Sequence, residues 1–209
     1  MDSRDCLNLQ KSDSQVTIGT LSHTDKLSIQ PEGLVTVIAS GIGADGIEYQ
    51  DDILYQAKPN LILDGARDII RDVMMGENGI TKISFGDLGK DTDASLSELI
   101  NVDAPLETDT ALVRKVGDKS FVAENIVPIG RGTSDSSTDR PGIRYTIVLE
   151  EEELVPEDED SQFILEMALV KEVKDEDGNV TDVLFSRKTH PVIIKTKDLR
   201  LTFIWEILF

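Results

Sequence analysis

The sequence predicts a mainly β fold: an antiparallel β-sandwich-like domain that carries one amphipathic helix and long loops. Three observations favour it, namely a long alternating stretch at the C-terminus, one segment with helical periodicity, and several short β-branched stretches between polar turns. In residues 199–209 every odd position is a large apolar residue (Leu199, Leu201, Phe203, Trp205, Ile207 and Phe209). This period of two places one face against a core. At about 3.3 Å per residue the stretch spans roughly 35 Å, so we expect a central strand.

At 209 residues the chain is long enough for one large β domain or two small ones. We expect an extended N-terminal arm over residues 1–33 and a β-rich domain over residues 34–209. The arm is polar, with one short alternating piece at Gln15–Gly19, and we expect it to dock on a neighbour. The sequence shows neither a secretory signal nor an apolar run of transmembrane length, so we expect cytosolic synthesis.

Residues 34–39 form the first predicted strand, and a glycine-rich turn follows at Gly41–Gly46. The turn matches G-x-G-x-x-G, and Asp64 lies about twenty residues further on, as in a dinucleotide-binding fold. Residues 47–52, however, alternate like a strand and bring three acidic residues to the position of the diphosphate. We therefore favour a glycine turn between two strands, with a cofactor site as the alternative.

Residues 59–75 form the predicted helix. One apolar stripe follows a period of 3.6 residues (Ile62, Ala66, Ile69, Ile70 and Val73), and charged residues cover the opposite side. Pro59 or Asn60 starts this helix, and Gly76 ends it. Met74 and Met75 extend the stripe, and we interpret them as core filler.

Four further strands are predicted at residues 80–86, 111–116, 120–129 and 143–149. Residues 87–110 form a long surface loop whose only helix-like piece is 95–100, and residues 130–142 form a polar connection. The acidic loop 150–160 holds eight acidic residues among eleven. Such a segment repels itself and stays solvated, or it attracts a basic partner.

The C-terminal strands occupy residues 163–209. Residues 163–169 alternate, Asp177-Gly178 supplies a hairpin turn, and residues 180–185 form the returning strand. Pro191 cannot donate a ladder hydrogen bond, so we expect it at an edge or a bulge. Lys195 and Lys197 are expected to be edge lysines that discourage wrong pairing.

Several residues are candidates for catalysis or ligand binding. The single cysteine, Cys6, excludes an internal disulfide, and we favour an incidental thiol over a catalytic one. Ser136 and Asp139 lie far in sequence from both histidines and lack a nucleophile elbow. We interpret His190 as an exposed histidine, neither ligand nor base.

Calcium binding is the other candidate chemistry. Asp175 and Asp177 faintly resemble an EF-hand loop, but Gly178 is misplaced for one, and the acidic residues in 87–110 show no ordered ligand spacing. The sequence therefore predicts no catalytic residue, no cofactor-binding residue, no metal ligand and no cofactor, and we expect the protein not to be an enzyme.

The formal net charge is −19. Contacts to phosphate need clustered Lys and Arg, so this charge argues against nucleic acid, and it disfavours anionic membranes as well. It is typical of a very soluble protein, or of a subunit that associates only with a complementary surface.

The C-terminal region resembles a family of tailed-bacteriophage virion structural proteins, of the tail-fibre, baseplate and collar type. These proteins end in E-x-G-L-x, a hairpin, L-F-A-R-K-T-F-x-P-I-x-K-T and L-x-x-x-W-x-I-x-F. The counterparts here are Glu166–Val170, Leu184–Thr196 and Leu201–Phe209. Ala168 stands where the family favours glycine, and His190 where it favours an aromatic residue.

A second block in such proteins pairs I-x-x-I-x-x-G with a later S-D-T-x-L. It is similar to Ile80–Gly86 and Thr108–Leu112. The resemblance implies a structural protein present in many copies in a virion, assembled in the host cytoplasm, that connects or decorates tail, baseplate, collar or fibre components. Its expected partners are other virion proteins and further copies of itself, with no nucleic acid and no membrane. The alternative is a receptor- or carbohydrate-binding β module, for which only Tyr49, Tyr55 and Tyr145 are at hand beyond the core Phe and Trp.

Overall fold

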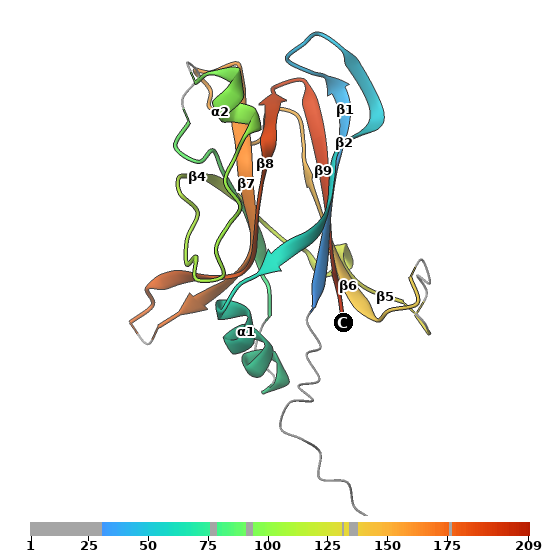
Figure 1. The fold of residues 1–209 in the computed structure, drawn as a ribbon, viewed down its shortest axis with the longest axis vertical. Coiled ribbons are helices and arrows are strands. Elements are labelled where there is room, and N and C mark those ends of the chain that lie inside the picture. The colour runs from blue at the N-terminus through green and yellow to red at the C-terminus, as the bar shows by residue number, and fades with distance from the viewer. Residues whose placement is uncertain (1–30, 76–78, 91–93, 131, 134–137, 176) are drawn as a thin grey trace, which may run out of the picture.

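A computed structural model describes residues 31–75, 79–90, 94–130, 132–133, 138–175 and 177–209 (Figure 1). Most of the expected arm therefore lies outside the described residues. The elements in chain order are β1 (Glu32–Ile42), β2 (Glu48–Ile62), α1 (Gly65–Met74), β3 (Lys82–Gly86), α2 (Leu96–Ile100), β4 (Lys115–Ser120), the 3₁₀ turn η1 (Ala123–Asn125), β5 (Ile126–Ile129), β6 (Gly142–Leu149), β7 (Ser161–Lys174), β8 (Val180–Thr196) and β9 (Leu199–Leu208).

Within the described residues, nine strands are hydrogen-bonded in the order β4-β3-β7-β8-β2-β1-β9-β6-β5, and every pairing is antiparallel. Strand β2 belongs to two layers. Most of its length pairs with β1, whereas Leu61 and Ile62 at its end pair with Arg187 and Ser186 of β8. We call β2-β1-β9-β6-β5 sheet A and β4-β3-β7-β8-β2 sheet B. The predicted mainly β, sandwich-like fold is confirmed.

Strand β9 lies at the centre of sheet A, between β1 and β6. The odd residues from Leu199 to Ile207 are buried, as the alternation predicts, while Phe209 follows the strand and is 40% exposed. The rings of Phe203 in sheet A and Phe85 in sheet B lie 4.9 Å apart between centroids. The two layers therefore pack face to face on one apolar core, to which Trp205 and Tyr145 also belong.

Helix α1 begins at Gly65, later than predicted, because residues 59–62 continue strand β2. The backbone of Leu61 and Ile62 pairs with β8, and this tertiary pairing overrides the helical periodicity. Only Ala66 and Ile69 of the predicted stripe are buried helix residues. The core-filler interpretation is wrong for the two methionines, since Met74 is 83% and Met75 74% exposed.

Most predicted strands are present with shifted bounds. The predicted strand 111–116 starts only at Lys115, and the predicted strand 120–129 divides into η1 and the four-residue strand β5. The glycine turn does connect two strands, β1 and β2. The helix-like piece is α2, which has a capping box of Ser95 and Glu98.

The segment between β3 and β4 covers the outer face of sheet B (Figure 1). Met167 and Leu169 of β7 join the main core, whereas Ala168 and Val170 join a second buried cluster on the opposite face, against which Leu112 packs. Sheet B is therefore buried on both faces. Most described residues of 87–110 are exposed or partly exposed, as expected of a surface loop, but Leu99 of α2 is buried.

The acidic loop 150–160 is a loop, as expected, but it is not solvated throughout. Val155 is buried, and Leu154 packs against the main core. The amide of Glu152 donates to the carbonyl oxygen of Lys197 at 2.9 Å. Two apolar residues thus anchor a segment that its charge alone would keep in water.

Candidate functional site

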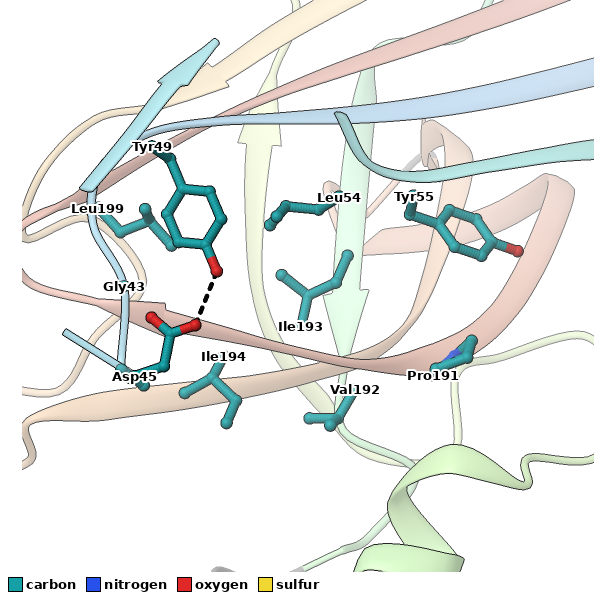
Figure 2. A pocket seen from close by; sticks show the side chains of 11 residues that line it. Gly43, Asp45, Tyr49, Leu54, Tyr55, Pro191, Val192, Ile193, Ile194 and Leu199 are labelled. Carbon is teal, nitrogen blue, oxygen red and sulfur yellow. Dashed lines mark hydrogen bonds between the residues drawn. The ribbon is translucent and has the colours of Figure 1, made fainter. Parts of the chain in front are cut away.

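A cleft separates the β1–β2 hairpin from β8, with a cavity of about 310 Å³ (Figure 2). It forms because β2 pairs with β8 only at its last two residues, so the two strands diverge towards the hairpin. One wall comes from the hairpin and the other from Pro191–Ile194. In Figure 2, Leu54 and Ile193 approach each other across the cleft, and Tyr49 closes one end.

Asp45 organises the hairpin end of this cleft. Its carboxylate accepts the amide of Ile47 at 3.0 Å and the hydroxyl of Tyr49 at 2.9 Å. These two hydrogen bonds lower the pKa of Asp45, and the same carboxylate raises the pKa of Tyr49. A Cβ atom at Gly43 would lie 2.6 Å from the Tyr49 ring, so only glycine leaves room for this contact. The glycines of the predicted G-x-G-x-x-G motif thus shape a strand turn.

Pro191 lies at an irregularity of the β7–β8 ladder. The partners change from Ile164↔Ile193 to Glu166↔Thr189, so β8 carries extra residues there. The prediction of an edge or bulge position for this proline is confirmed.

His190 is buried, and the expectation of an exposed histidine is wrong. Its ring lies 5.2 Å from the ring of Tyr55, a residue of the cleft wall. Nδ1 lies 2.8 Å from the carbonyl oxygen of Pro191, and Nε2 has no hydrogen-bond partner among the described residues. Burial, with a smaller contribution from the charge of Lys188, lowers the pKa of His190 to about 4. The imidazole is therefore neutral near pH 7.

A buried charge cluster, formed by Asp109, Glu166 and Arg187, lies on the outer face of sheet B. Arg187 donates through Nε and Nη2 to Oε2 of Glu166, at 2.9 and 2.5 Å, and through Nη1 to Asp109. Oε1 of Glu166 accepts the amide of Val113 at 2.8 Å. Glu166 is fully buried, and Arg187 is 6% exposed. The cluster fastens the covering segment to β7 and β8.

Neighbouring groups extend this fastening. Asp87 is buried and accepts Nε of Arg114 at 2.7 Å, and the hydroxyl of Thr189 donates to the carbonyl oxygen of Asp103 at 2.7 Å. A Cβ atom at Gly86 would lie 2.6 Å from Oε1 of Glu166. A pocket of about 340 Å³ opens above Arg187, but its guanidinium is already paired with two carboxylates.

A second group of charges lies on β3, β4 and β8. Nζ of Lys82 lies 2.8 Å from Asp182 and 3.2 Å from Asp118, and Lys115 contacts the same two carboxylates. Burial opposes the charge of Lys82, but these pairs outweigh it and raise the pKa of Lys82. Burial likewise opposes the charge of Asp118, yet hydrogen bonds from Lys115, Ser84 and Lys82 lower its pKa. These pairs tie neighbouring strands together.

The two predicted edge lysines behave differently from each other. Lys195 is fully buried, so the edge-lysine interpretation is wrong for it, and its ammonium donates to the carbonyl oxygen of Thr196 at 2.9 Å. Burial lowers the pKa of Lys195, and the acidic residues Glu150, Glu151 and Glu153 act in the opposite direction. Lys197 remains partly exposed.

The other candidate residues do not gather into one site. Cys6 and Ser136 lie outside the described residues, and Asp139 is exposed. The carboxylate of Asp175 accepts the amides of Asp177 and Asn179, at 3.0 and 2.8 Å, within the β7–β8 turn. Among the described residues, no group of three or more His, Cys, Asp or Glu side chains is arranged to hold a metal ion. No helix in the described part of the chain is long and apolar enough to cross a membrane.

The buried charge cluster is not among the sequence predictions. A signal was present, because Glu166 interrupts the apolar run of β7 and Arg187 follows the apolar pair Leu184-Phe185. Charged residues are almost never buried unless they are paired with an opposite charge. Glu166 and Arg187 within apolar strands could therefore have predicted a buried ion pair. Comparisons with protein-family models, curated proteins and solved structures found no match.

Proposed function

We propose that this protein is a structural subunit of a tailed-bacteriophage virion, where it connects or decorates tail, baseplate, collar or fibre components as one of many copies. One observation supports the proposal most directly. The blocks that resemble the virion family contribute Gly86, Asp109, Glu166 and Arg187, and these four residues meet at the buried charge cluster. These motif residues hold a covering segment against a sheet. Such a structural role for motif residues is typical of an architectural protein.

The surface charge fits the same role. The net charge is −19, and copies of one strongly acidic chain repel each other until a complementary surface is offered. Such repulsion keeps a subunit soluble before it is built into a particle. Assembly then depends on particular contact surfaces.

Immunoelectron microscopy of particles from a phage genome that encodes this chain tests the proposal. An antibody against the purified chain should label the tail, baseplate, collar or fibres. A genome with Glu206→Gln, a change on the partly exposed face of sheet A, serves as the matched control and should keep the label. Absence of the chain from purified particles, despite its abundance in infected cells, would overturn the virion role.

The cleft beside the β1–β2 hairpin favours a second candidate, the carbohydrate-binding module. Tyr49 and Tyr55 line this cleft, and the Asp45 carboxylate that holds Tyr49 is a hydrogen-bond acceptor suited to sugar hydroxyls. Tyr145, by contrast, is buried in the core. A glycan array probed with the wild type and with Tyr49→Phe, which keeps the ring, decides this candidate: sugar binding that weakens in the variant supports it, and no binding removes it.

A further inference from the structure

An apolar groove lies between α1 and the ends of the sheet A strands β5, β6 and β9, with a cavity of about 350 Å³. We call it the end groove. It is lined by apolar residues of the helix and its following loop (Ile69, Ile70, Val73, Met74 and Ile80), of the sheets (Ile126, Ile143, Tyr145, Phe185 and Ile207), and by Gly79 and Phe209. Among the described residues of this lining there is no charged side chain.

Large apolar side chains are exposed to solvent at the rim of the end groove. Met74 is 83%, Val73 48% and Phe209 40% exposed, and Met75 follows at the end of the helix. A helix normally turns such a stripe towards a core, and contiguous exposed apolar surface marks an interaction site. The chain therefore presents an apolar surface next to a cavity.

The N-terminal segment enters the structure at the same end of the molecule. Glu32, the first residue of β1, pairs with Leu208 of β9 and forms an ion pair with Arg140. Arg140 also donates through Nε to the carbonyl oxygen of Phe209 at 3.4 Å, and Phe209 lines the groove. The described part of the chain therefore begins beside the end groove, at Pro31 and Glu32.

Part of that segment has the chemistry to fill it. Residues 14–24 contain no Asp, Glu, Lys or Arg, and Val16 and Ile18 alternate with polar residues within them. An uncharged segment can enter an apolar groove without the cost of desolvating a charge. Twelve residues separate Ile18 from Pro31, and an extended chain of that length reaches at most roughly 40 Å, which is enough to bring Ile18 to the end groove of an adjacent subunit.

We propose that the end groove binds Val16 and Ile18 from the N-terminal segment of a second copy of this chain, so that each subunit donates one segment and accepts another. This inference rests on the multi-copy part of the proposed function. Contacts of this head-to-tail kind are heterologous and generate rings or filaments.

Disulfide trapping in the purified protein tests the inference. In a Cys6→Ser background, chains with Ile18→Cys are mixed with chains with Met74→Cys under mild oxidation. We expect a disulfide-linked heterodimer to exceed the one formed when the second chain carries Ile47→Cys by at least about tenfold. Ile47 is the matched control because it is 56% exposed but lies in the β1–β2 turn, at the other end of β1.

Two results would overturn the inference. One is equal trapping at positions 74 and 47. The other is a chain carrying both Ile18→Cys and Met74→Cys that closes only an internal disulfide at micromolar concentration, which would place the segment on its own subunit. Trapping by the isolated protein together with its absence from virions would leave the groove contact in place and remove the virion role. If trapping fails although the chain is present in virions, the groove contact is overturned and the virion role remains.

Discussion

Sheet A and sheet B share strand β2, but they differ in how they use charge. In β9 of sheet A, buried apolar residues alternate with partly or fully exposed ones such as Arg200 and Glu206. Among the described residues, every charged side chain that is buried belongs to sheet B or follows β3 directly (Lys82, Asp87, Glu166, Lys171, Arg187 and Lys195). Three elements cover most of these charges: the segment between β3 and β4 lies over Glu166 and Arg187, α1 supplies Asp72 to Lys171, and the acidic loop 150–160 acts on Lys195.

Each sheet contains an Arg–Glu ion pair, and the two pairs differ in their exposure to solvent. Arg144 and Glu206 are opposite each other on β6 and β9, with Arg144 Nη2 2.6 Å from Glu206 Oε1, and their side chains remain 26% and 16% exposed. The Glu166–Arg187 pair is a comparable contact with almost no exposure. If burial decides the energetic role of an ion pair, equivalent changes at the two pairs should have very different effects.

The largest expected effect comes from Arg187→Met. This change leaves Glu166 buried without its cation, which typically costs about 3–5 kcal/mol. Urea denaturation at pH 7 measures the loss in the free energy of unfolding. The double variant Glu166→Leu with Arg187→Met should recover much of it, since no lone charge remains; a loss below 1 kcal/mol in the single variant would contradict the burial argument.

His190→Phe tests sheet B through pH. Because the folded state holds the pKa of His190 near 4, below its ordinary 6.5, the unfolded chain binds a proton first as pH falls. The contribution of neutral His190 is thus complete above pH 6.5 and declines towards pH 4. The free energy of unfolding of His190→Phe minus that of the wild type is the quantity to measure, by thermal or urea unfolding. We expect this difference to be about 2 kcal/mol more favourable to the variant at pH 4.5 than at pH 7.

Tyr55→Phe is the control for this experiment, because it keeps the ring that packs on His190. It should leave the difference between pH 7 and pH 4.5 unchanged. If the pH dependence of stability is the same in His190→Phe as in the wild type, the pKa of His190 does not differ between the folded and unfolded states, which would contradict the prediction.

Gly86→Ala has an intermediate expected effect. The new methyl group would meet the Glu166 carboxylate at 2.6 Å and the carbonyl oxygen of Arg114 at 2.7 Å, so we expect a loss of about 1–3 kcal/mol from overpacking. Gly178→Ala is a useful comparison, because nothing lies within 4 Å and only its φ of +84° opposes a side chain, at roughly 1 kcal/mol. Equal losses at both glycines would show that contact with the buried cluster adds no cost.

The smallest effect is expected for Arg144→Gln, which breaks the Arg144–Glu206 pair of sheet A. A partly exposed pair contributes about 0–1 kcal/mol, and salt screens it. Urea denaturation at low and at 0.5 M salt should show a loss that shrinks with added salt. A loss as large as that of Arg187→Met would remove the contrast between the sheets.

The same contrast explains what the sequence predicts well. Strand β9 and the Asp177-Gly178 hairpin are encoded by local patterns, alternation and turn residues, and both are found where expected. The end of β2 is not encoded locally, because its partner in β8 lies far along the chain. The helical periodicity of residues 59–75 therefore predicted a helix that is too long, since residues 59–62 belong to strand β2.

The candidate sites follow the same division. The glycine turn beside the cleft was recognised from its residues, whereas the burial of His190 and Lys195 depends on how distant strands pack. The Glu166–Arg187–Asp109 contact joins three separate stretches of sequence, and no local period connects them. The apolar rim at Met74 was misassigned to the core because periodicity identifies a stripe but not what covers it.

The pairing of β1 with β9 constrains how the protein is made. Between the synthesis of these two strands a ribosome takes roughly 8–30 s, at about 5–20 residues per second. During that time the edge of β1 that β9 finally occupies remains open, and the corresponding edge of β6 remains open from the synthesis of β6 onwards. Strand β9 closes sheet A only when it has emerged and pairs with β1 and β6.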